Sequence, residues 1–452
     1  MNAPHPLPTL QPYDIGHERY VALLNPETAF WSLVDKTQVD QELAGGKLLQ
    51  EFRAKSEDFA REIHALRFQL KPSGVYVNPT ERCNLDCTYC YIPQNLRRHG
   101  KDMPEERLLD SLERLKAYFG TVMDGSRKPR LIFHGAEPLM NKDALFAAID
   151  AYGNDFAFGV QTNGTLLTDQ AAEFLMSRNV SIGLSLDGPE APITNATRHT
   201  WVGAGVHEHV LKAMDRLKGY GSWSVITTCT TENLPHLKDM VELFHRHEVP
   251  TCMLNAVRCT LAGARGVRPE DGAFAKAFTA ALDRSHELFQ ETGRKLVVAN
   301  FANVLLAILA PTARRLMCDI SPCGGGRAFF ALAADGGLFP CSEFIGLPEF
   351  QGGNLFGKGI EAALESPAFK VVTERNVDRI QPCDSCAIRH FCGSPCPAEA
   401  HEMNGGMDKI GAFCEFYEEQ VRYALRLIAD GKSDDFLWDG WDQGTETVFS
   451  AC

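Results

Sequence analysis

Strand-like apolar runs alternate with helix-length amphipathic stretches along the chain from Gly74 onward. Six such runs occur, at residues 74–80, 130–133, 157–161, 180–186, 224–229 and 251–257. This alternation is typical of β–α units that build a parallel sheet. Six units in a row favour an α/β fold with an open, partial (β/α)6 barrel of the TIM type over a doubly wound sheet. The loops that follow the strands of such a barrel meet at its carboxyl-terminal mouth and carry its chemistry.

Composition excludes several other classes of protein. The chain has 452 residues, of which 44% are hydrophobic and 23% charged, as in ordinary globular proteins, so disordered, collagen-like and coiled-coil architectures are excluded. A net charge of −13 gives no basic stripe for nucleic acid. No apolar run is long enough to span a membrane, and residues 1–10 lack the features of a secretion signal. We therefore expect a cytoplasmic protein without nucleic-acid or membrane partners.

Fifteen cysteines in a chain with no export signal argue against a disulfide scaffold, because a reducing compartment keeps thiols free. Their positions are uneven. One group lies early in the chain, and a second group crowds into residues 318–414. This distribution predicts two metal-binding regions.

The early group is Cys83, Cys87 and Cys90, with the spacing C-x3-C-x2-C directly after the first predicted strand. Three thiolates on one short loop suit three irons of a cubane iron–sulfur cluster and leave the fourth iron open. A zinc site is the alternative, with His99 as the nearby imidazole for a fourth ligand.

This loop resembles that of the radical S-adenosylmethionine (radical SAM) superfamily, in which an aromatic residue commonly precedes the last cysteine, as Tyr89 does here. The resemblance implies that the amino and carboxylate groups of S-adenosylmethionine chelate the open iron. One electron then breaks the S–C5′ bond and releases a 5′-deoxyadenosyl radical, which can remove hydrogen from unactivated C–H bonds. It also implies a low-potential electron donor such as a flavodoxin or ferredoxin.

Three further loops resemble the binding loops of that superfamily. Gly135-Ala136-Glu137-Pro138 is similar to the G-G-E-P turn that holds the methionyl ammonium, with Ala136 in place of the second glycine. A positive φ at Ala136 would cost about 1 kcal/mol. The resemblance also assigns contacts with the ribose and the methionyl carboxylate to Thr162, Asn163, Ser185, Asp187 and Arg198. Each of these motifs, taken alone, is also compatible with an ordinary turn.

The later group contains Cys383-x2-Cys386-x5-Cys392-x3-Cys396 and then Cys414, preceded by Cys323, Gly336 and Cys341. This layout resembles the SPASM domain, a C-terminal domain of many radical SAM enzymes, over about residues 318–420. The resemblance implies one auxiliary cluster on Cys323, Cys341 and Cys396 with Cys318 as the fourth ligand, and a second on Cys383, Cys386, Cys392 and Cys414. Three [4Fe–4S] clusters result.

Two alternatives remain open for this region. A free Cys318 would leave an open iron for a substrate thiolate, and a zinc ribbon could use Cys383, Cys386, Cys392 and Cys396. Glu343 is a candidate proton acceptor, with a solvated surface charge as the alternative. Cys229, Cys252 and Cys259 are interpreted as small buried apolar residues.

The predicted domains are an N-terminal segment 1–72, a radical SAM partial barrel 73–310, a SPASM domain 311–425 and a tail 426–452 to which no role is assigned. Residues 18–35 predict a short strand, a turn at Asn25-Pro26 and an amphipathic helix. The N-terminal segment is either a cap over the barrel's open edge or a module that resembles, faintly, those that bind leader peptides by strand addition.

The leading function is a radical SAM/SPASM enzyme that modifies a peptide or protein, with a thioether cross-link as the expected product. C–C cross-linking and decarboxylation are open. Sulfatase maturation is an alternative, although that group has an aspartate where this chain has Ser342. Oxidation of a small molecule is another. A zinc-ribbon scaffold or an electron carrier is the non-enzymatic alternative, and it would not need residues 135–138 and 185–187.

Overall fold

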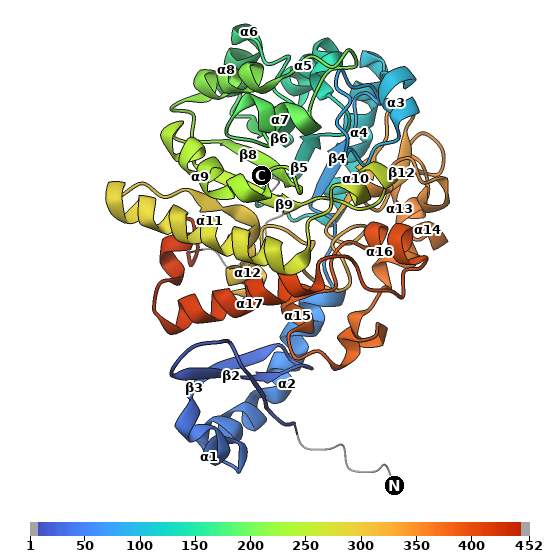
Figure 1. The fold of residues 1–452 in the computed structure, drawn as a ribbon. Helices are drawn as coiled ribbons and strands as arrows, with labels where there is room; N and C mark the ends of the chain where they lie inside the picture. Colours follow the sequence, from blue (N-terminus) through green and yellow to red (C-terminus); the bar gives the residue numbers. More distant parts are fainter. Residues whose placement is uncertain (1–7, 444–452) are drawn as a thin grey trace.

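Six parallel strands form the centre of the molecule, in the computed structural model that describes residues 8–443 (Figure 1). They are β4 (Gly74–Val77), β5 (Arg130–Phe133), β6 (Ala157–Thr162), β7 (Ser181–Ser185), β8 (Trp223–Cys229) and β9 (Thr251–Ala256). Each pairs in parallel with the next, from Val77 opposite Phe133 to Cys229 opposite Ala256. The predicted partial barrel is therefore confirmed, with strand ends within a few residues of those expected.

The sheet extends beyond these six strands at both edges. A two-residue strand, β10 (Val297–Val298), pairs with β9. On the other edge β11 (Phe329–Leu332) pairs in parallel with β4, and β12 (Gly337–Phe339) and β13 (Gly353–Asn354) follow in antiparallel order. The resulting order is β10-β9-β8-β7-β6-β5-β4-β11-β12-β13. The cysteine-rich region thus begins as a continuation of the barrel sheet.

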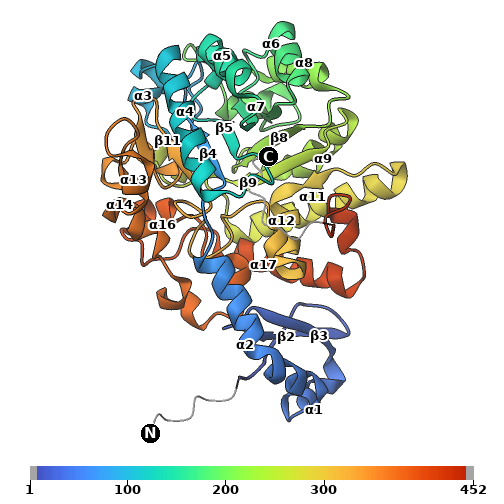
Figure 2. The same cartoon turned by 180° about the vertical axis from the view of Figure 1, so that it is seen from behind.

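Helices follow the strands and cover the outer side of the barrel (Figures 1 and 2). The longer ones are α4 (Glu105–Val122), α5 (Lys142–Tyr152), α6 (Asp169–Ser177), α8 (His207–Leu217), α9 (Leu237–Arg246), α11 (Asp271–Thr292) and α12 (Ala299–Leu309). The shorter ones are α3 (Gln94–His99), α7 (Ala191–Thr197) and α10 (Ala262–Gly266). Their starts follow local rules: the Thr168 hydroxyl accepts a hydrogen bond from Ala171 N and so caps α6.

The C-terminal region consists of short elements ending in one long helix. These are α13 (Gly359–Leu364), α14 (Pro367–Thr373), α15 (Arg389–Cys392), α16 (Pro397–Asn404) and α17 (Cys414–Ala429). Helix α17 lies along α11 (Figure 1). The rings of Phe274 and Phe416 stack between these helices, with centroids 3.8 Å apart. The single-turn 3-10 helices of the chain are η1 (Lys36–Gln38), η2 (Pro138–Asn141), η3 (Leu234–His236), η4 (Pro311–Ala313), η5 (Ser342–Phe344), η6 (Pro348–Phe350), η7 (Val377–Arg379), η8 (Cys383–Ser385) and η9 (Ser433–Phe436).

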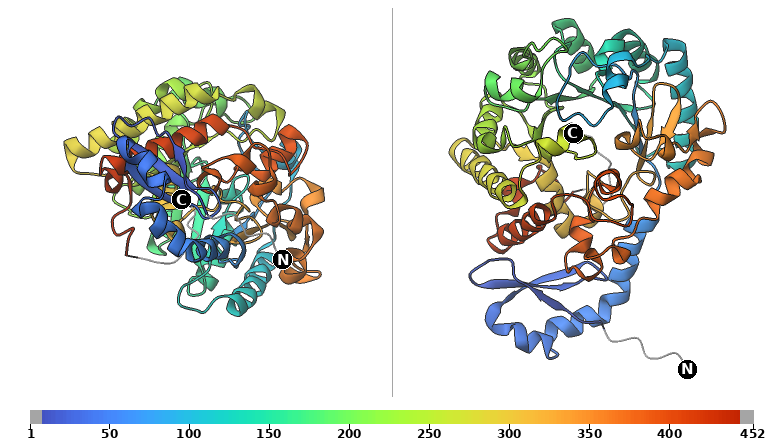
Figure 3. Two further views of the ribbon diagram at one scale, coloured as in Figure 1. Left: turned by 90° about the horizontal axis from the view of Figure 1, so that it is seen from below. Right: turned by 45° about the vertical axis from the view of Figure 1, so that its right-hand side comes forward.

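The N-terminal segment forms a small module of its own, set to one side of the barrel and joined to it by a long helix (Figure 3). An antiparallel sheet of β1 (Gln11–Tyr13), β2 (Tyr20–Asn25) and β3 (Phe30–Asp35) precedes α1 (Val39–Leu43) and α2 (Lys47–Phe68). The prediction of an amphipathic helix after the Asn25-Pro26 turn is wrong, because those residues form β3.

The physical reason is the tightness of the turn between β2 and β3. The Asn25 side chain accepts hydrogen bonds from Thr28 N (2.9 Å) and the Thr28 hydroxyl (2.8 Å), and Ala29 has a positive φ of 55°. This arrangement reverses the chain directly, so that Trp31 pairs with Leu24. Residues 1–7 and 444–452, including part of the predicted tail, lie outside the described residues. Within residues 8–443, no helix combines the length and apolar character that crossing a bilayer requires.

Candidate active site

The loop after β4 carries Cys83, Cys87 and Cys90 and is held by backbone hydrogen bonds from both sides. Cys83 N donates to Arg97 O (2.8 Å), and Asp86 N donates to His199 O (2.8 Å). The indole of Trp201 donates to Cys83 O (2.8 Å). The thiols are therefore presented from a constrained backbone at the carboxyl end of the first barrel strand.

The three thiols lie close enough to influence one another electrostatically. Burial raises the pKa of Cys87 to about 11, and it also raises the pKa of Cys83 and Cys90, with neighbouring thiols adding to the effect on Cys83. Buried thiolates therefore need a cationic partner here. Three thiols gathered on one loop, with no disulfide among them, are a donor set that fits an iron–sulfur cluster.

Glu137 joins the loop after β5 to the loop after β6. Its carboxylate is fully buried and accepts hydrogen bonds from Leu139 N (3.1 Å), the Thr162 hydroxyl (2.7 Å) and Asn163 N (2.7 Å). Burial raises the pKa of Glu137, and these hydrogen bonds oppose that change. Asn163 in turn lies 3.9 Å from Cys83 Sγ through its side-chain amide. The predicted Gly135–Pro138 and Thr162–Asn163 motifs thus meet beside the first cysteine.

The turn at Gly135 and Ala136 is tight. Gly135 has a φ of 76°, and a Cβ added there would come within 2.2 Å of the Asn78 side chain. Ala136 also has a positive φ, of 28°. The backbone at Ala136 is therefore strained, because an L-residue is disfavoured at positive φ. Pro138 follows as a buried residue that starts η2.

A buried polar triad follows β7. The Tyr89 hydroxyl donates to Asp187 Oδ2, and Arg198 Nη1 donates to the Tyr89 oxygen (2.5 Å) and lies 3.4 Å from Asp187 Oδ2. All three residues are at most 8% exposed. Arg198 Nε has no hydrogen-bond partner among the described residues. Ser185 ends β7 as a half-buried residue. The loops after β4 and β7 therefore share one polar cluster, with a guanidinium N–H left over for a ligand.

His134, which directly precedes Gly135, was not predicted from the sequence as a site residue. Its ring packs edge-on against Tyr76, with centroids 5.2 Å apart, and its buried Nδ1 has no partner among the described residues. Burial lowers the pKa of His134 to about 4, so the imidazole is neutral at pH 7. Its place before a motif glycine at the end of a barrel strand was the signal that could have identified it.

The later cysteines form two groups in space. Cys383, Cys386, Cys392 and Cys414 influence one another's ionisation, and burial raises the pKa of all four thiols. They come from η8, α15 and the start of α17. A four-thiol group of this kind fits the predicted second auxiliary cluster.

The other group contains Cys318, Cys323 and Cys341, whose thiols also interact electrostatically. Cys396 joins them through shared neighbours, since Glu343 and Arg258 interact with both Cys318 and Cys396. Cys318 is open to solvent, yet burial among surrounding atoms raises its pKa to about 12. The structure thus brings Cys318 to the group to which it was assigned. The zinc-ribbon alternative groups Cys396 with Cys383, Cys386 and Cys392. In the structure Cys396 instead shares its neighbours with the group that contains Cys318.

Glu343 is not a solvated surface residue. Its side chain is 19% exposed, its Oε1 lies 3.8 Å from Arg258 Nε, and its Oε2 has no partner among the described residues. Burial raises the pKa of Glu343 to about 7, with Arg258 opposing the change. Glu343 interacts electrostatically with both Cys90 and Cys341. It therefore lies between the early and late cysteine groups, and its alternative interpretation as a surface charge is wrong.

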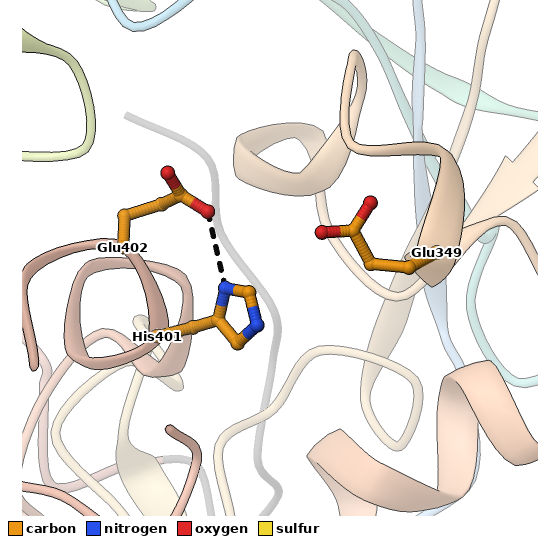
Figure 4. A group of neighbouring side chains, drawn as sticks. All are labelled: Glu349, His401 and Glu402. Carbon is orange, nitrogen blue, oxygen red and sulfur yellow. Dashed lines mark hydrogen bonds and ion pairs between the residues drawn. The ribbon is translucent and has the colours of Figure 1, made fainter. Parts of the chain in front are cut away.

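Cys229, Cys252 and Cys259 are fully buried, as interpreted from the sequence. A further polar group lies on η6 and α16, where the ligand atoms of Glu349, His401 and Glu402 are within 4.8 Å of one another (Figure 4). His401 Nδ1 is already engaged by Glu402 Oε1 (3.0 Å), and Glu349 is exposed. We interpret this group as a surface ion-pair network and assign it no metal.

These observations define a barrel protein whose mouth is lined by three neighbouring thiols and a buried polar cluster. A family model, "Radical SAM superfamily", matches residues 77–244. An uncharacterized protein of Archaeoglobus fulgidus is 39% identical over 93% of this chain and 95% of its own length. The cysteine-type anaerobic sulfatase-maturating enzyme of Clostridium perfringens is 23% identical over 79% of this chain and 98% of its own.

Two solved structures share the fold. A tagged anSMEcpe with bound AdoMet aligns with a TM-score of 0.69 at 19% identity, covering 83% of this chain and 98% of its own. Streptococcus suis SuiB bound to the precursor peptide SuiA aligns with a TM-score of 0.59 at 11% identity, covering 90% of this chain and 99% of its own. The chain belongs to the radical SAM superfamily, and it is an enzyme whose C-terminal region has the cysteine layout of a SPASM domain.

Proposed function

We propose that this enzyme uses S-adenosylmethionine and three [4Fe–4S] clusters to modify a peptide or protein. The observation that carries the proposal is the convergence of three thiols, the Glu137 carboxylate and the Tyr89–Asp187–Arg198 triad at one end of the barrel. The names of related proteins support a peptide substrate, since they include a sulfatase-maturating enzyme and a protein solved with its precursor peptide.

The first cluster would be held by Cys83, Cys87 and Cys90, and the two auxiliary clusters by the later groups. S-adenosylmethionine bound at the first cluster supplies a 5′-deoxyadenosyl radical able to take hydrogen from a C–H bond. The chain's own residues would bind and orient the cofactor. Arg198 would donate its free Nε–H to the carboxylate, and the backbone of the Gly135–Pro138 turn would accept hydrogen bonds from the ammonium. Buried surroundings keep water away from the reacting atoms.

The N-terminal module is proposed to hold the substrate's leader segment. In its three-stranded sheet β3 lies at the edge, with no strand beyond it among the described residues. An extended peptide can add to such an edge through main-chain hydrogen bonds. Phe30, the first residue of β3, packs against Phe52 and Phe59 of α2, with ring centroids 4.8 and 5.2 Å away. A proline placed at the middle of an added peptide should weaken its binding, as fluorescence anisotropy of a labelled precursor would show.

A thioether cross-link is the proposed product. Sulfatase-type maturation is the second candidate, favoured by the likeness to sulfatase-maturating enzymes and disfavoured by Ser342, where that group has an aspartate. The two are separated by mass spectrometry of the treated peptide. A thioether removes two hydrogen atoms and links two residues, whereas conversion of one cysteine to formylglycine removes two hydrogen atoms and the sulfur and adds an oxygen. Formylglycine made from serine also loses two hydrogen atoms, and fragmentation of the peptide separates it from a thioether because no residues are linked. A product from a small molecule alone would contradict both.

Glu343 stays a prediction as the proton acceptor, supported by its place between Cys90 and Cys341 beside Arg258. Glu343→Gln should leave 5′-deoxyadenosine release intact and lower the yield of modified peptide. An equal loss of both products would assign Glu343 to cofactor binding instead.

The decisive test is anaerobic reconstitution. About twelve irons and as many sulfides per chain are expected, together with release of 5′-deoxyadenosine once a reductant is added. A flavodoxin or ferredoxin is the proposed physiological donor, in a reducing compartment such as the cytoplasm. About four irons or fewer would contradict the auxiliary clusters, and an inert coloured protein would contradict the use of S-adenosylmethionine.

A further inference from the structure

Two of the buried arginines have no carboxylate partner in the described part of the chain, whereas the others do. Seven arginines are buried among the described residues: Arg67, Arg97, Arg198, Arg314, Arg327, Arg375 and Arg389. Five of them have a carboxylate within ion-pair distance, namely Asp378, Asp86, Asp187, Asp319 and, for Arg389, both Asp378 and Glu27. No such pair is formed by Arg327 or Arg375 with any carboxylate in residues 8–443. A buried guanidinium without an anion is costly, so these two positions need an explanation.

Arg375 is the more completely enclosed of the two. It is 5% exposed, and every one of its donor nitrogens is used. Nε donates to Met407 O (2.9 Å), Nη1 to Ser394 O (2.8 Å), and Nη2 to the Ser394 hydroxyl (3.0 Å) and Lys409 O (2.8 Å). These neutral acceptors fix the orientation of the guanidinium and leave its charge uncompensated.

The thiols of both cysteine groups, once ionised as cluster ligands, would supply the compensating charge. Arg375 interacts electrostatically with Cys323 and Cys396 of the first group and with Cys383 and Cys392 of the second. Its main partner, Ser394, lies between Cys392 and Cys396 in the chain. Arg327 contacts only the first group, donating from Nε to Cys323 O (3.1 Å). Both exceptions therefore lie beside auxiliary cysteines, whereas Arg389, which also contacts Cys386, has two carboxylate partners.

We propose that Arg375 is a counter-ion shared by the two auxiliary clusters, held between them to raise the reduction potential of both. A thiolate-ligated iron–sulfur cluster carries a net negative charge that grows on reduction, so a fixed cation nearby favours the reduced form. This inference rests on the auxiliary clusters of the proposed function. Arg375 is a positioning and tuning residue, which need not touch the substrate.

The test is a potentiometric titration with dithionite, followed by electron paramagnetic resonance. Cys83, Cys87 and Cys90 are replaced by alanine in every sample, so that only the auxiliary clusters contribute signals. At the midpoint potential of the protein that keeps Arg375, Arg375→Gln should lower the ratio of reduced to oxidised cluster about tenfold for both clusters. For a one-electron couple this corresponds to a potential about 59 mV lower. Arg375→Lys, which keeps the charge, should stay near the unsubstituted value.

A second pair of variants leaves the arginine in place. Ser394→Asp puts a carboxylate beside Arg375 Nη2 and should lower both potentials, whereas the uncharged Ser394→Asn should not. Both residues tolerate the positive φ of 49° at this position. This pair decides the matter if Arg375→Gln fails to take up iron. Within residues 8–443 the Ser394 hydroxyl bonds to Arg375 and interacts with Cys383, and it forms no hydrogen bond with Cys323 or Cys396. A shift in the first auxiliary cluster therefore reports charge alone.

Each outcome bears on one proposal only. Unchanged potentials in iron-loaded Arg375→Gln, equal shifts with Gln and Lys, or equal shifts with Asp and Asn at position 394 would overturn the shared counter-ion. Failure of the starting protein to hold about eight auxiliary irons would instead remove the clusters of the proposed function.

Discussion

The barrel mouth and the C-terminal cysteine region bring their cysteines together in different ways. At the mouth, the cysteines follow one strand, and their polar partners follow the neighbouring strands in chain order, so the parallel topology brings them together. In the auxiliary region, cysteines 318–414 stand on short helices and turns and gather by packing between segments far apart in sequence. The geometry of the barrel mouth depends on a regular sheet. The geometry of the auxiliary region depends on buried turns and on buried arginines that have no carboxylate partner among the described residues. The two should therefore fail separately when mutated.

The largest expected effect is a split between the two regions. Cys87→Ala should reduce 5′-deoxyadenosine release at least about a hundredfold, because it removes a proposed ligand of the cluster at which the cofactor is proposed to bind. Cys386→Ala should leave that release within a few-fold while abolishing modified peptide. Liquid chromatography of the nucleoside and mass spectrometry of the peptide measure the two yields. Equal loss of the nucleoside in both variants would mean that the regions act as one unit.

A backbone contact in the auxiliary region gives the next effect. A Cβ at Gly393, where φ is 70°, would lie 2.7 Å from the backbone of Asp319 and Ile320, between Cys318 and Cys323. Gly393→Ala should cost about 2–4 kcal/mol and lower the iron content by roughly one cluster, since backbone must move. Gly405→Ala is the control, because its φ is 73° and nothing lies near its Cβ. Iron analysis with thermal unfolding would show whether the two differ.

A hydrogen-bond change at the mouth is expected to be smaller. Glu137→Gln turns an acceptor of three hydrogen bonds into a group that must direct an N–H at a donor, at a cost of about 1–3 kcal/mol. The melting temperature measured by calorimetry and the affinity for S-adenosylmethionine should both fall, and the iron content of the auxiliary region should not change. Thr162→Val removes one of the three donors and should cost less. A loss of auxiliary iron in Glu137→Gln would contradict the separation of the regions.

The smallest effect concerns backbone strain in the same turn. Ala136→Gly should stabilise the folded protein by up to about 1 kcal/mol, because glycine adopts the positive φ of 28° without penalty. Gly135→Ala should do the reverse, since its Cβ would collide with Asn78. Thermal unfolding of the pair measures both signs. A destabilised Ala136→Gly would show that the alanine methyl contributes packing that exceeds the strain.

Much of the barrel could be predicted because its elements are encoded locally. The six strands have apolar runs bounded by turn residues, and the order of the motifs after them followed from parallel pairing. The hairpin of β2 and β3 was missed, since the sequence after Asn25 has a pattern compatible with a helix. The Asn25 side chain and a left-handed Ala29 reverse the chain there.

The electrostatic character of the site was less accessible to prediction. Nothing local distinguishes Glu343 from a surface glutamate, because its partner Arg258 follows β9, far away in the sequence. In the same way, Arg375 has an unremarkable sequence context, and only folding surrounds it with carbonyl groups and two sets of thiols.

The sequence alone determined the barrel, the two cysteine regions and the polar loops of the mouth, because strand periodicity and ligand spacing are local properties of the chain. Tertiary structure alone decided which buried charges have partners and which do not. Solvation and Coulomb interactions depend on every segment packed around a group, and no short stretch of sequence records them.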